Sequence, residues 1–262
     1  METLYANLIA KGYAPKSVRN YNACVHSMLE KAVRQNDLVR NVAGLVDLPR
    51  RVRRDPPMIT PLEAQAFLKA SREHRLEALF ILAITTAARQ GELLGLTWDS
   101  VDLEAETLNI RRALQKVEGK VGLVEPKTPS SLRTVALPEL AVAALRRHHA
   151  RQIREKMFLG RAWDNELNLV FTTPLGTPLD KDNVRKRELP PIYKAAGLPP
   201  ELTFHDLRHI AASLALGNGV SITTVSEMLG HADPSTTLRV YAHAIPGAQR
   251  EAARIFDKLL TG

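Results

Sequence analysis

The spacing of apolar residues predicts a chain made mainly of helices. In the last quarter of the chain, Leu207, Ala211 and Leu214 follow the i, i+4, i+7 rule for one buried helix face. Thr203 can cap that helix, because Asp206 stands three residues later as the return half of a capping box. We therefore expect a helix that begins just after Thr203.

Two shorter helices are predicted after it. Ser221 precedes a periodic segment that Gly230 ends, since Gly is common just past a helix. Its expected buried residues are Ile222, Val225, Met228 and Leu229. The Asp233-Pro234-Ser235 run is a cap and turn signal for the third helix, which places Tyr241 near its end.

Helices are also expected earlier in the chain. Thr60 and Pro61 begin one, and the segment 76–88 is almost wholly apolar, which predicts a core helix. Further helices are predicted from Pro138 to about Met157 and over 182–196. The residues expected inside the first and third of these helices are Leu62, Ala66, Phe67, Leu68, Leu140, Ala144 and Leu145.

Short β-prone segments interrupt the helices. They cover 98–103, 107–114, 134–137 and 169–172, with a turn at Glu104-Ala105 between the first two. The expected fold class is therefore mainly α with a small antiparallel β-sheet.

The first fifth of the chain has a different character. Residues 1–57 read as helical and carry ten Lys and Arg against five Asp and Glu. An apolar stripe is expected at Val18, Tyr21, Val25, Met28, Leu29, Ala32 and Val33. A basic run at 50–54 is followed by Pro56-Pro57, which is typical of a linker. We expect domains at 1–57 and 58–262.

Charge and composition narrow the function. The 262 residues carry a net charge of +8, which favours a polyanionic partner such as nucleic acid. A single cysteine, Cys24, excludes an internal disulfide framework and favours a reducing, cytoplasmic setting. No signal peptide or membrane span is expected, and no zinc-ligand spacing, dinucleotide fingerprint or P-loop occurs.

Several polar residues lie at spacings that suggest chemistry. His205 and Arg208 stand three apart, as do Arg89 and Glu92, so each pair can share a helix face. His231 follows a Leu-Gly, and a tyrosine comes ten residues later. Alone, each is more often a solvated pair, a capping residue or a core aromatic.

Together these motifs resemble the tyrosine recombinase (phage integrase) family. The resemblance rests on H-D-L-R, L-G-H and Tyr241, and on T-A-A-R-Q-G-E around Arg89, with Ala87-Ala88 where Gly-Leu is more usual. It extends to K-T-P-S-S-L-R-T-V-A-L-P, which resembles the family's β-hairpin and puts Lys127 on its turn.

The resemblance implies a DNA strand transferase that works through a 3′-phosphotyrosyl intermediate. Tyr241 is the implied nucleophile, Arg89 and Arg208 hold the phosphate, and Lys127 is the implied general acid. His205 would assist proton transfer from the tyrosine, His231 would bond a phosphate oxygen, and Glu92 would support Arg89. No ATP, other cofactor or catalytic metal is implied.

The resemblance also implies partners and domains. Double-stranded DNA is the expected substrate, and residues 1–57 resemble the end of a helical, SAM-like core-binding domain that precedes the catalytic domain. The segment Ala248–Leu260 is expected to be an amphipathic helix that docks on a neighbouring protomer in a ring-like tetramer on DNA. An accessory directionality factor is a further expected partner, and no membrane is expected.

Two other interpretations stay open. The family's core-binding domain usually has about two more helices in front, so the chain could be a truncated, catalytically impaired DNA-binding remnant. A type IB topoisomerase shares the Arg, Lys, His and Tyr logic, although the spacing from H-x-x-R to L-G-H favours a recombinase.

Overall fold

The computed structural model describes residues 1–50, 57–117, 119–126, 131–242, 256–257 and 259–260. It divides into two compact units, 1–55 and 56–262. Among these described residues, no helix is both long enough and apolar enough to cross a bilayer.

The first unit is helical, as its sequence predicts. It contains α1 (Glu2–Ala10), α2 (Pro15–Arg34) and a 3₁₀ turn (Val42–Leu45). The Tyr5 hydroxyl donates to Asn22 Oδ1 at 2.9 Å, which joins α1 to α2 inside the unit. Of the expected apolar stripe on α2, Val18 is buried, whereas Tyr21 and Met28 are exposed.

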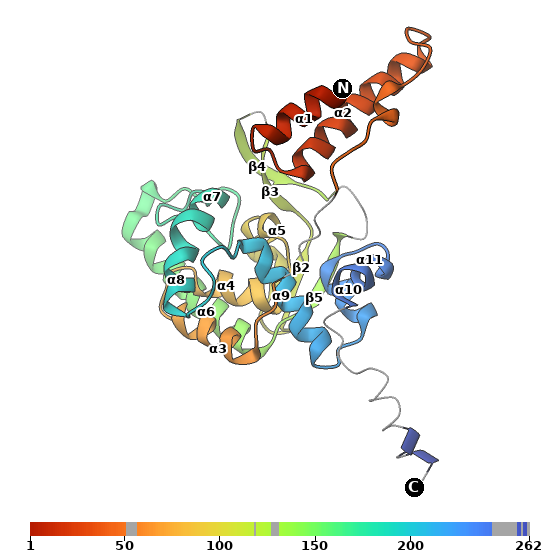
Figure 1. Ribbon diagram of the computed structural model, residues 1–262. Helices are drawn as coiled ribbons and strands as arrows, with labels where there is room; N and C mark the ends of the chain where they lie inside the picture. Colours follow the sequence, from red (N-terminus) through yellow and green to blue (C-terminus); the bar gives the residue numbers. More distant parts are fainter. Residues whose placement is uncertain (51–56, 118, 127–130, 243–255, 258, 261–262) are drawn as a thin grey trace. The chain divides into compact units, whose positions relative to one another are not determined.

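The second unit is built from helices around one large core, and the predicted fold class is confirmed. Figure 1 shows α9 running past α4 and on to α10, and α9 packs against both. The helices are α3 (Pro61–Ala70), α4 (Glu77–Thr85), α5 (Gln90–Leu94), α6 (Glu139–Leu159), α7 (Lys181–Asn183), α8 (Leu189–Ala195), α9 (Phe204–Gly217), α10 (Ile222–Leu229) and α11 (Pro234–Tyr241).

The predicted helix starts agree with the structure. The capping boxes at Thr60 and Thr203 are both formed, and Ser221 and Asp233 cap α10 and α11. Gly230 ends α10 with φ of 63°, the left-handed conformation that glycine adopts without a steric cost. The end of the predicted 76–88 helix comes early, at Thr85.

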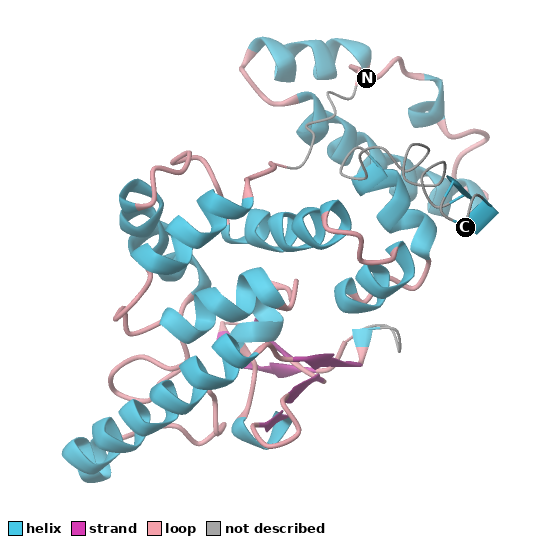
Figure 2. Cartoon of the chain, turned by 90° about the horizontal axis from the view of Figure 1, so that it is seen from below, coloured by secondary structure: helices cyan, strands magenta, loops and turns pink. Residues whose placement is uncertain are grey.

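Two small antiparallel sheets lie beside the helices (Figure 2). One contains β1 (Val101–Asp102), β2 (Thr107–Ile110) and β5 (Arg133–Ala136), in the order β1-β2-β5. The other is a hairpin of β3 (Ala113–Val117) and β4 (Lys120–Val124), which the sequence reading missed.

Three expectations about strands and helices were wrong in detail. Residues Trp98–Ser100 form a 3₁₀ turn rather than a strand. The segment 169–172 makes only isolated bridges, through Leu169 and Thr172. The helix predicted over 182–196 contains a π-helical stretch, Val184–Glu188, because Pro190 and Pro191 have no N–H groups to donate to the preceding turn.

The core gathers around α4, whose residues 78–84 are all buried. Phe67, Ala144 and Leu145 are buried there as predicted. Leu62 and Leu140 are exposed, which corrects their predicted burial. Both stand in the first turn of a helix, α3 and α6 respectively.

Candidate functional site

Arg89 stands at the start of α5 and is fixed by its neighbour Glu92. Its backbone N–H and its guanidinium both donate to the Glu92 carboxylate, at 2.8 and 2.7 Å. The chain enters this helix through Ala87, whose φ is +52°. That value explains why glycine is more usual at this position, since left-handed backbone favours a residue without a Cβ.

Glu92 also binds a second guanidinium, that of Arg133 at the start of β5. The Arg133 Nη2 to Glu92 Oε2 distance is 2.8 Å, and both side chains are 7% exposed. Burial opposes ionisation of Glu92, but its hydrogen bonds and charge pairing with Arg133 and Arg89 outweigh burial and lower its pKa. One ionised carboxylate therefore links α5 to β5.

Arg208 is the most enclosed cation of the site. It lies on α9, is 4% exposed, and donates to the carbonyl oxygens of Ala87 at 2.5 Å and Leu229 at 2.6 Å. Burial, together with the positive charge of Arg89, lowers its pKa to about 10, so it stays charged at neutral pH. Arg208 thus ties the turn before α5 to the end of α10.

His231 follows the left-handed glycine that ends α10. Its Nδ1 lies 2.8 Å from Thr237 Oγ1, and its Nε2 lies 3.3 Å from the Arg208 guanidinium. Burial and the charge of Arg208 lower its pKa to about 4, which keeps the ring neutral. Because guanidinium only donates, Nε2 accepts and Nδ1–H donates to Thr237.

His205 lies one turn before Arg208 on α9, and its side chain is exposed. Its ring stands edge-on to that of His209, with centroids 4.8 Å apart. Partial desolvation and the charge of Arg208 lower its pKa.

Tyr241 ends α11 and is 1% exposed. Its hydroxyl oxygen lies 2.6 Å from Nδ1 of His209, a residue that the sequence reading did not single out. Burial raises the pKa of Tyr241 to about 12, although the charge of Arg208 acts in the other direction. At neutral pH the phenol is therefore protonated.

Most of the expected site residues converge. The structure brings Arg89, Glu92, Arg208, His231 and Tyr241 together, with the His205 ring at the rim. Lys127 and most of the expected helix 248–260 lie outside the described residues; Phe256 and Leu259, which are described, are exposed.

The sequence reading missed three residues that hold this site together: Arg133, His209 and Thr237. Two of them could have been found from the sequence. Arg133 belongs to the K-T-P-S-S-L-R pattern, and His209 stands four residues after His205, on the same helix face. No sequence feature marks Thr237, because its contact with His231 depends on the turn between α10 and α11.

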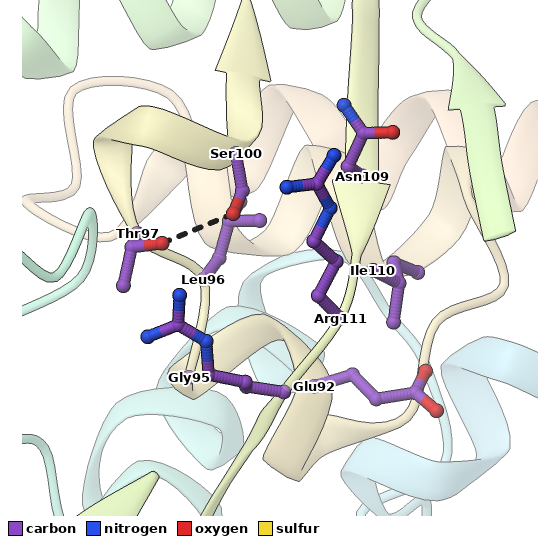
Figure 3. Close-up of a pocket in the computed structure, with 9 residues that line it drawn as sticks. Glu92, Gly95, Leu96, Thr97, Ser100, Asn109, Ile110 and Arg111 are labelled. Atoms are coloured by element: carbon purple, nitrogen blue, oxygen red, sulfur yellow. Dashed lines mark hydrogen bonds between the residues drawn. The ribbon is translucent and has the colours of Figure 1, made fainter. Parts of the chain in front are cut away.

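A pocket beside α5 shares only Glu92 with this cluster. Glu92, Gly95, Thr97, Ser100, Asn109 and Arg111 are among its lining residues. In Figure 3 the hydroxyls of Thr97 and Ser100 bond to each other, at 3.0 Å, and the Glu92 carboxylate points away from them. Among the described residues there is also no group of three His, Cys, Asp or Glu side chains that could hold a metal.

Comparison with known proteins gives the family. The Phage integrase family matches residues 57–246. A protein described as tyrosine recombinase XerC-like, from Caldanaerobacter subterraneus subsp. tengcongensis, is 32% identical over 276 residues, covering 99% of this chain and 70% of that protein. The ICEBs1 integrase of Bacillus subtilis is 27% identical over 256 residues, which cover 97% of this chain and 68% of that protein.

Solved structures agree on the fold. The Tn1549 transposon integrase, in complex with a circular intermediate DNA, gives a TM-score of 0.80 at 20% identity, over 97% of this chain and 84% of that one. The XerA recombinase gives 0.60 at 25% identity, over 98% and 81%. With the converging Arg, His and Tyr side chains, these matches identify the chain as a member of the phage integrase family of tyrosine recombinases, the enzymes that cleave and transfer DNA strands.

Proposed function

We propose that Tyr241 is the nucleophile of this recombinase and that it forms a 3′-phosphotyrosyl link to DNA. The proposal rests on one observation above all. Tyr241 is the last residue of α11, and α11 packs against α9 at the short stretch that carries Arg208. His209, whose ring lies 2.6 Å from the Tyr241 hydroxyl, is the residue directly after Arg208 on α9, which supports a shared phosphate for the two groups.

Arg89 and Arg208 hold the phosphate in this proposal. A guanidinium can make two parallel hydrogen bonds to non-bridging oxygens, which lysine cannot imitate. Glu92 and Arg133 keep Arg89 in place, and the Ala87 and Leu229 carbonyls keep Arg208 in place. Charge that builds on the phosphate in the transition state then meets groups already oriented toward it.

The remaining roles follow from the family resemblance. Lys127 donates a proton to the leaving 5′ oxygen, and His231, whose Nδ1 is held by Thr237, bonds a phosphate oxygen when it turns from Arg208. His205 assists proton transfer from the nucleophile. The covalent link conserves the energy of the broken phosphodiester, so a 5′-hydroxyl of a second strand reverses the attack.

The same proposal covers the partners. Double-stranded DNA is the substrate, residues 1–57 are part of a helical core-binding domain, and the catalytic domain is 58–262. Protomers assemble on DNA as a tetramer through the C-terminal segment, with an accessory factor setting direction. The net charge of +8 suits binding to DNA. The protein acts in the cytoplasm, where the chromosome lies.

The test is covalent trapping on DNA. A library of nicked duplexes with a randomised centre is incubated with the wild-type protein, and DNA that stays bound after denaturation is recovered and sequenced. We expect a defined sequence to be enriched, and Tyr241→Phe to form no adduct with it while still binding in a salt-dependent way. Tyr193→Phe, at another buried tyrosine, is the matched control and should still form adducts.

An adduct that persists in Tyr241→Phe means that another residue is the nucleophile. A wild-type protein that binds duplex DNA but never becomes covalently attached would instead support the DNA-binding remnant.

A further inference from the structure

The nucleophile's hydroxyl lies against an imidazole that the proposed mechanism does not use. His209 Nδ1 is 2.6 Å from the Tyr241 oxygen, and the two rings lie 5.6 Å apart at 50°. His209 is half-buried on α9, and its ring contacts the exposed ring of His205. The position of His209 is fixed by the helix, and that of Tyr241 by the packing of α11 on α9.

The other two imidazoles of the site are less suited to take the tyrosine's proton. Both nitrogens of His231 are engaged, one with Thr237 and one with Arg208. His205 is exposed and contacts the ring of His209, which in turn contacts the tyrosine, so the help that His205 gives to proton transfer passes through His209. Among the described residues, His209 is the imidazole within hydrogen-bond distance of the phenol.

We infer that His209 is a catalytic residue, the general base that takes the Tyr241 proton as the phenol attacks phosphorus. The inference rests on the proposed function, in which Tyr241 is the nucleophile. In the step, the O–H bond of Tyr241 breaks and its proton goes to Nδ1 of His209. The phenol oxygen bonds to phosphorus, the bond from phosphorus to the 5′ oxygen breaks, and that oxygen takes a proton from the general acid. In the reverse step His209 returns its proton to the departing phenol.

The surroundings of His209 keep its ring ready to accept. On its own helix it faces His205, Asp206 and Arg208, and across the packing interface it faces Tyr241, with His231 nearby. Burial and the neighbouring His205 lower its pKa to about 4, so the ring is neutral. A neutral ring with Nε2–H leaves Nδ1 free to accept from the phenol.

Transfer to His209 is unfavourable before attack, because the phenol is much less acidic than the imidazolium. The proton therefore moves together with formation of the oxygen–phosphorus bond, which removes the basicity of the phenol oxygen. The negative charge of the incoming phosphate also stabilises the imidazolium. General-base catalysis of this kind contributes about 10²–10⁴-fold in rate.

The decisive experiment separates proton acceptance from positioning. His209→Asn keeps an amide oxygen that can accept a hydrogen bond but cannot take a proton at neutral pH. The single-turnover rate of adduct formation is measured on the nicked duplex selected with the wild-type protein, alongside the Kd for that duplex. We expect the rate of adduct formation to fall by at least about 10²-fold, with an unchanged Kd. His149→Asn, the same change at an exposed histidine of α6, should match the wild type.

A second change tests the chemistry directly. A fluorinated tyrosine with a more acidic phenol is placed at position 241, so that less help is needed to remove its proton. It should raise the His209→Asn rate at least tenfold and change the rate of otherwise wild-type protein far less. His209→Gln, whose amide reaches further, serves as the second variant if the asparagine variant loses DNA binding.

The inference is overturned if His209→Asn reacts within threefold of the wild type, or faster, which would mean that His209 only restrains the tyrosine. It is equally overturned if the variant is slow and the acidic phenol restores nothing. Failure of the wild-type protein to form any adduct is a different result, and it contradicts the assignment of Tyr241.

Discussion

At the scale of single residues, the site depends on one left-handed peptide. Ala87 has φ of +52° and is fully buried, and this conformation aims its carbonyl at Arg208. Left-handed backbone costs an L-residue about 1–2 kcal/mol, and a β-branched side chain makes it worse. The strain thus lies in the same short segment that orients both guanidiniums.

Substitution of valine at positions 87 and 88 would separate strain from crowding. Both alanines are buried, but only Ala87 has a positive φ, so both variants overpack the core and one adds backbone strain. We expect Ala87→Val to lower the free energy of unfolding by about 1 kcal/mol more than Ala88→Val does. Urea denaturation of the two proteins measures the difference, and equal losses would contradict the role given to φ.

The candidate residues were largely predictable because their chemistry is carried by short, spaced motifs. Arg89, Arg208, His231 and Tyr241 follow from residue type and order. His209 did not, because its role depends on the distance between two helices, and that distance is set by packing. The reason for the usual glycine at position 87 was also hidden, since the sequence alone shows an alanine and no backbone angle.

At the scale of elements, the end of α10 is held by two arginines. Arg133 Nε donates to the Met228 carbonyl at 2.8 Å, and Arg208 donates to the next carbonyl, that of Leu229. Carbonyls at a helix C-terminus lack partners within the helix and attract cations. This arrangement fixes the turn that carries His231.

Removal of Arg133 should therefore cost more than removal of a surface arginine. Arg133→Met breaks the buried pair with Glu92, and breaking such a pair costs about 3–5 kcal/mol. Arg146→Met breaks an exposed pair with Glu104, which is worth about 0–1 kcal/mol. Chemical denaturation of both variants tests this, and a similar small loss in each would show that Glu92 needs only Arg89.

Elements with strong local signals were predicted better than those set by tertiary contact. The starts of α3, α9, α10 and α11 were predictable because Thr, Ser, Asp and Pro residues cap or begin these helices. The hairpin of β3 and β4 was missed, because its strands are short and half polar. It packs close to α5 at Gly95, where a Cβ would meet the Leu114 nitrogen at 2.5 Å.

At the scale of the whole molecule, positive charge is concentrated at one end of the sequence. Residues 1–57 carry ten Lys and Arg against five Asp and Glu, and four of the ten basic residues lie between 50 and 54. If this run lies along a DNA backbone, each lost phosphate contact should flatten the dependence of log K on log salt by about 0.9.

We expect the joint replacement of Arg50, Arg51, Arg53 and Arg54 by alanine to flatten that slope by up to about 4 and to weaken binding of different sequences alike. Arg154→Ala with Lys156→Ala, on α6, removes exposed cations from a helix that contributes no site residue, and should change the slope less. Titration of duplex DNA at several salt concentrations measures both, and identical slopes would assign the run to solvent.

The charge balance around Glu92 affects how strongly buffer anions compete with DNA. Glu92 bonds to the guanidiniums of Arg89 and Arg133, and Arg208 adds a third positive charge nearby, so positive charge exceeds negative charge in the site when no nucleic acid is bound. Small oxyanions such as sulfate suit such a cradle and would occupy it in competition with a strand. The identity of the buffer anion, and not the ionic strength alone, would then set the apparent affinity of this recombinase.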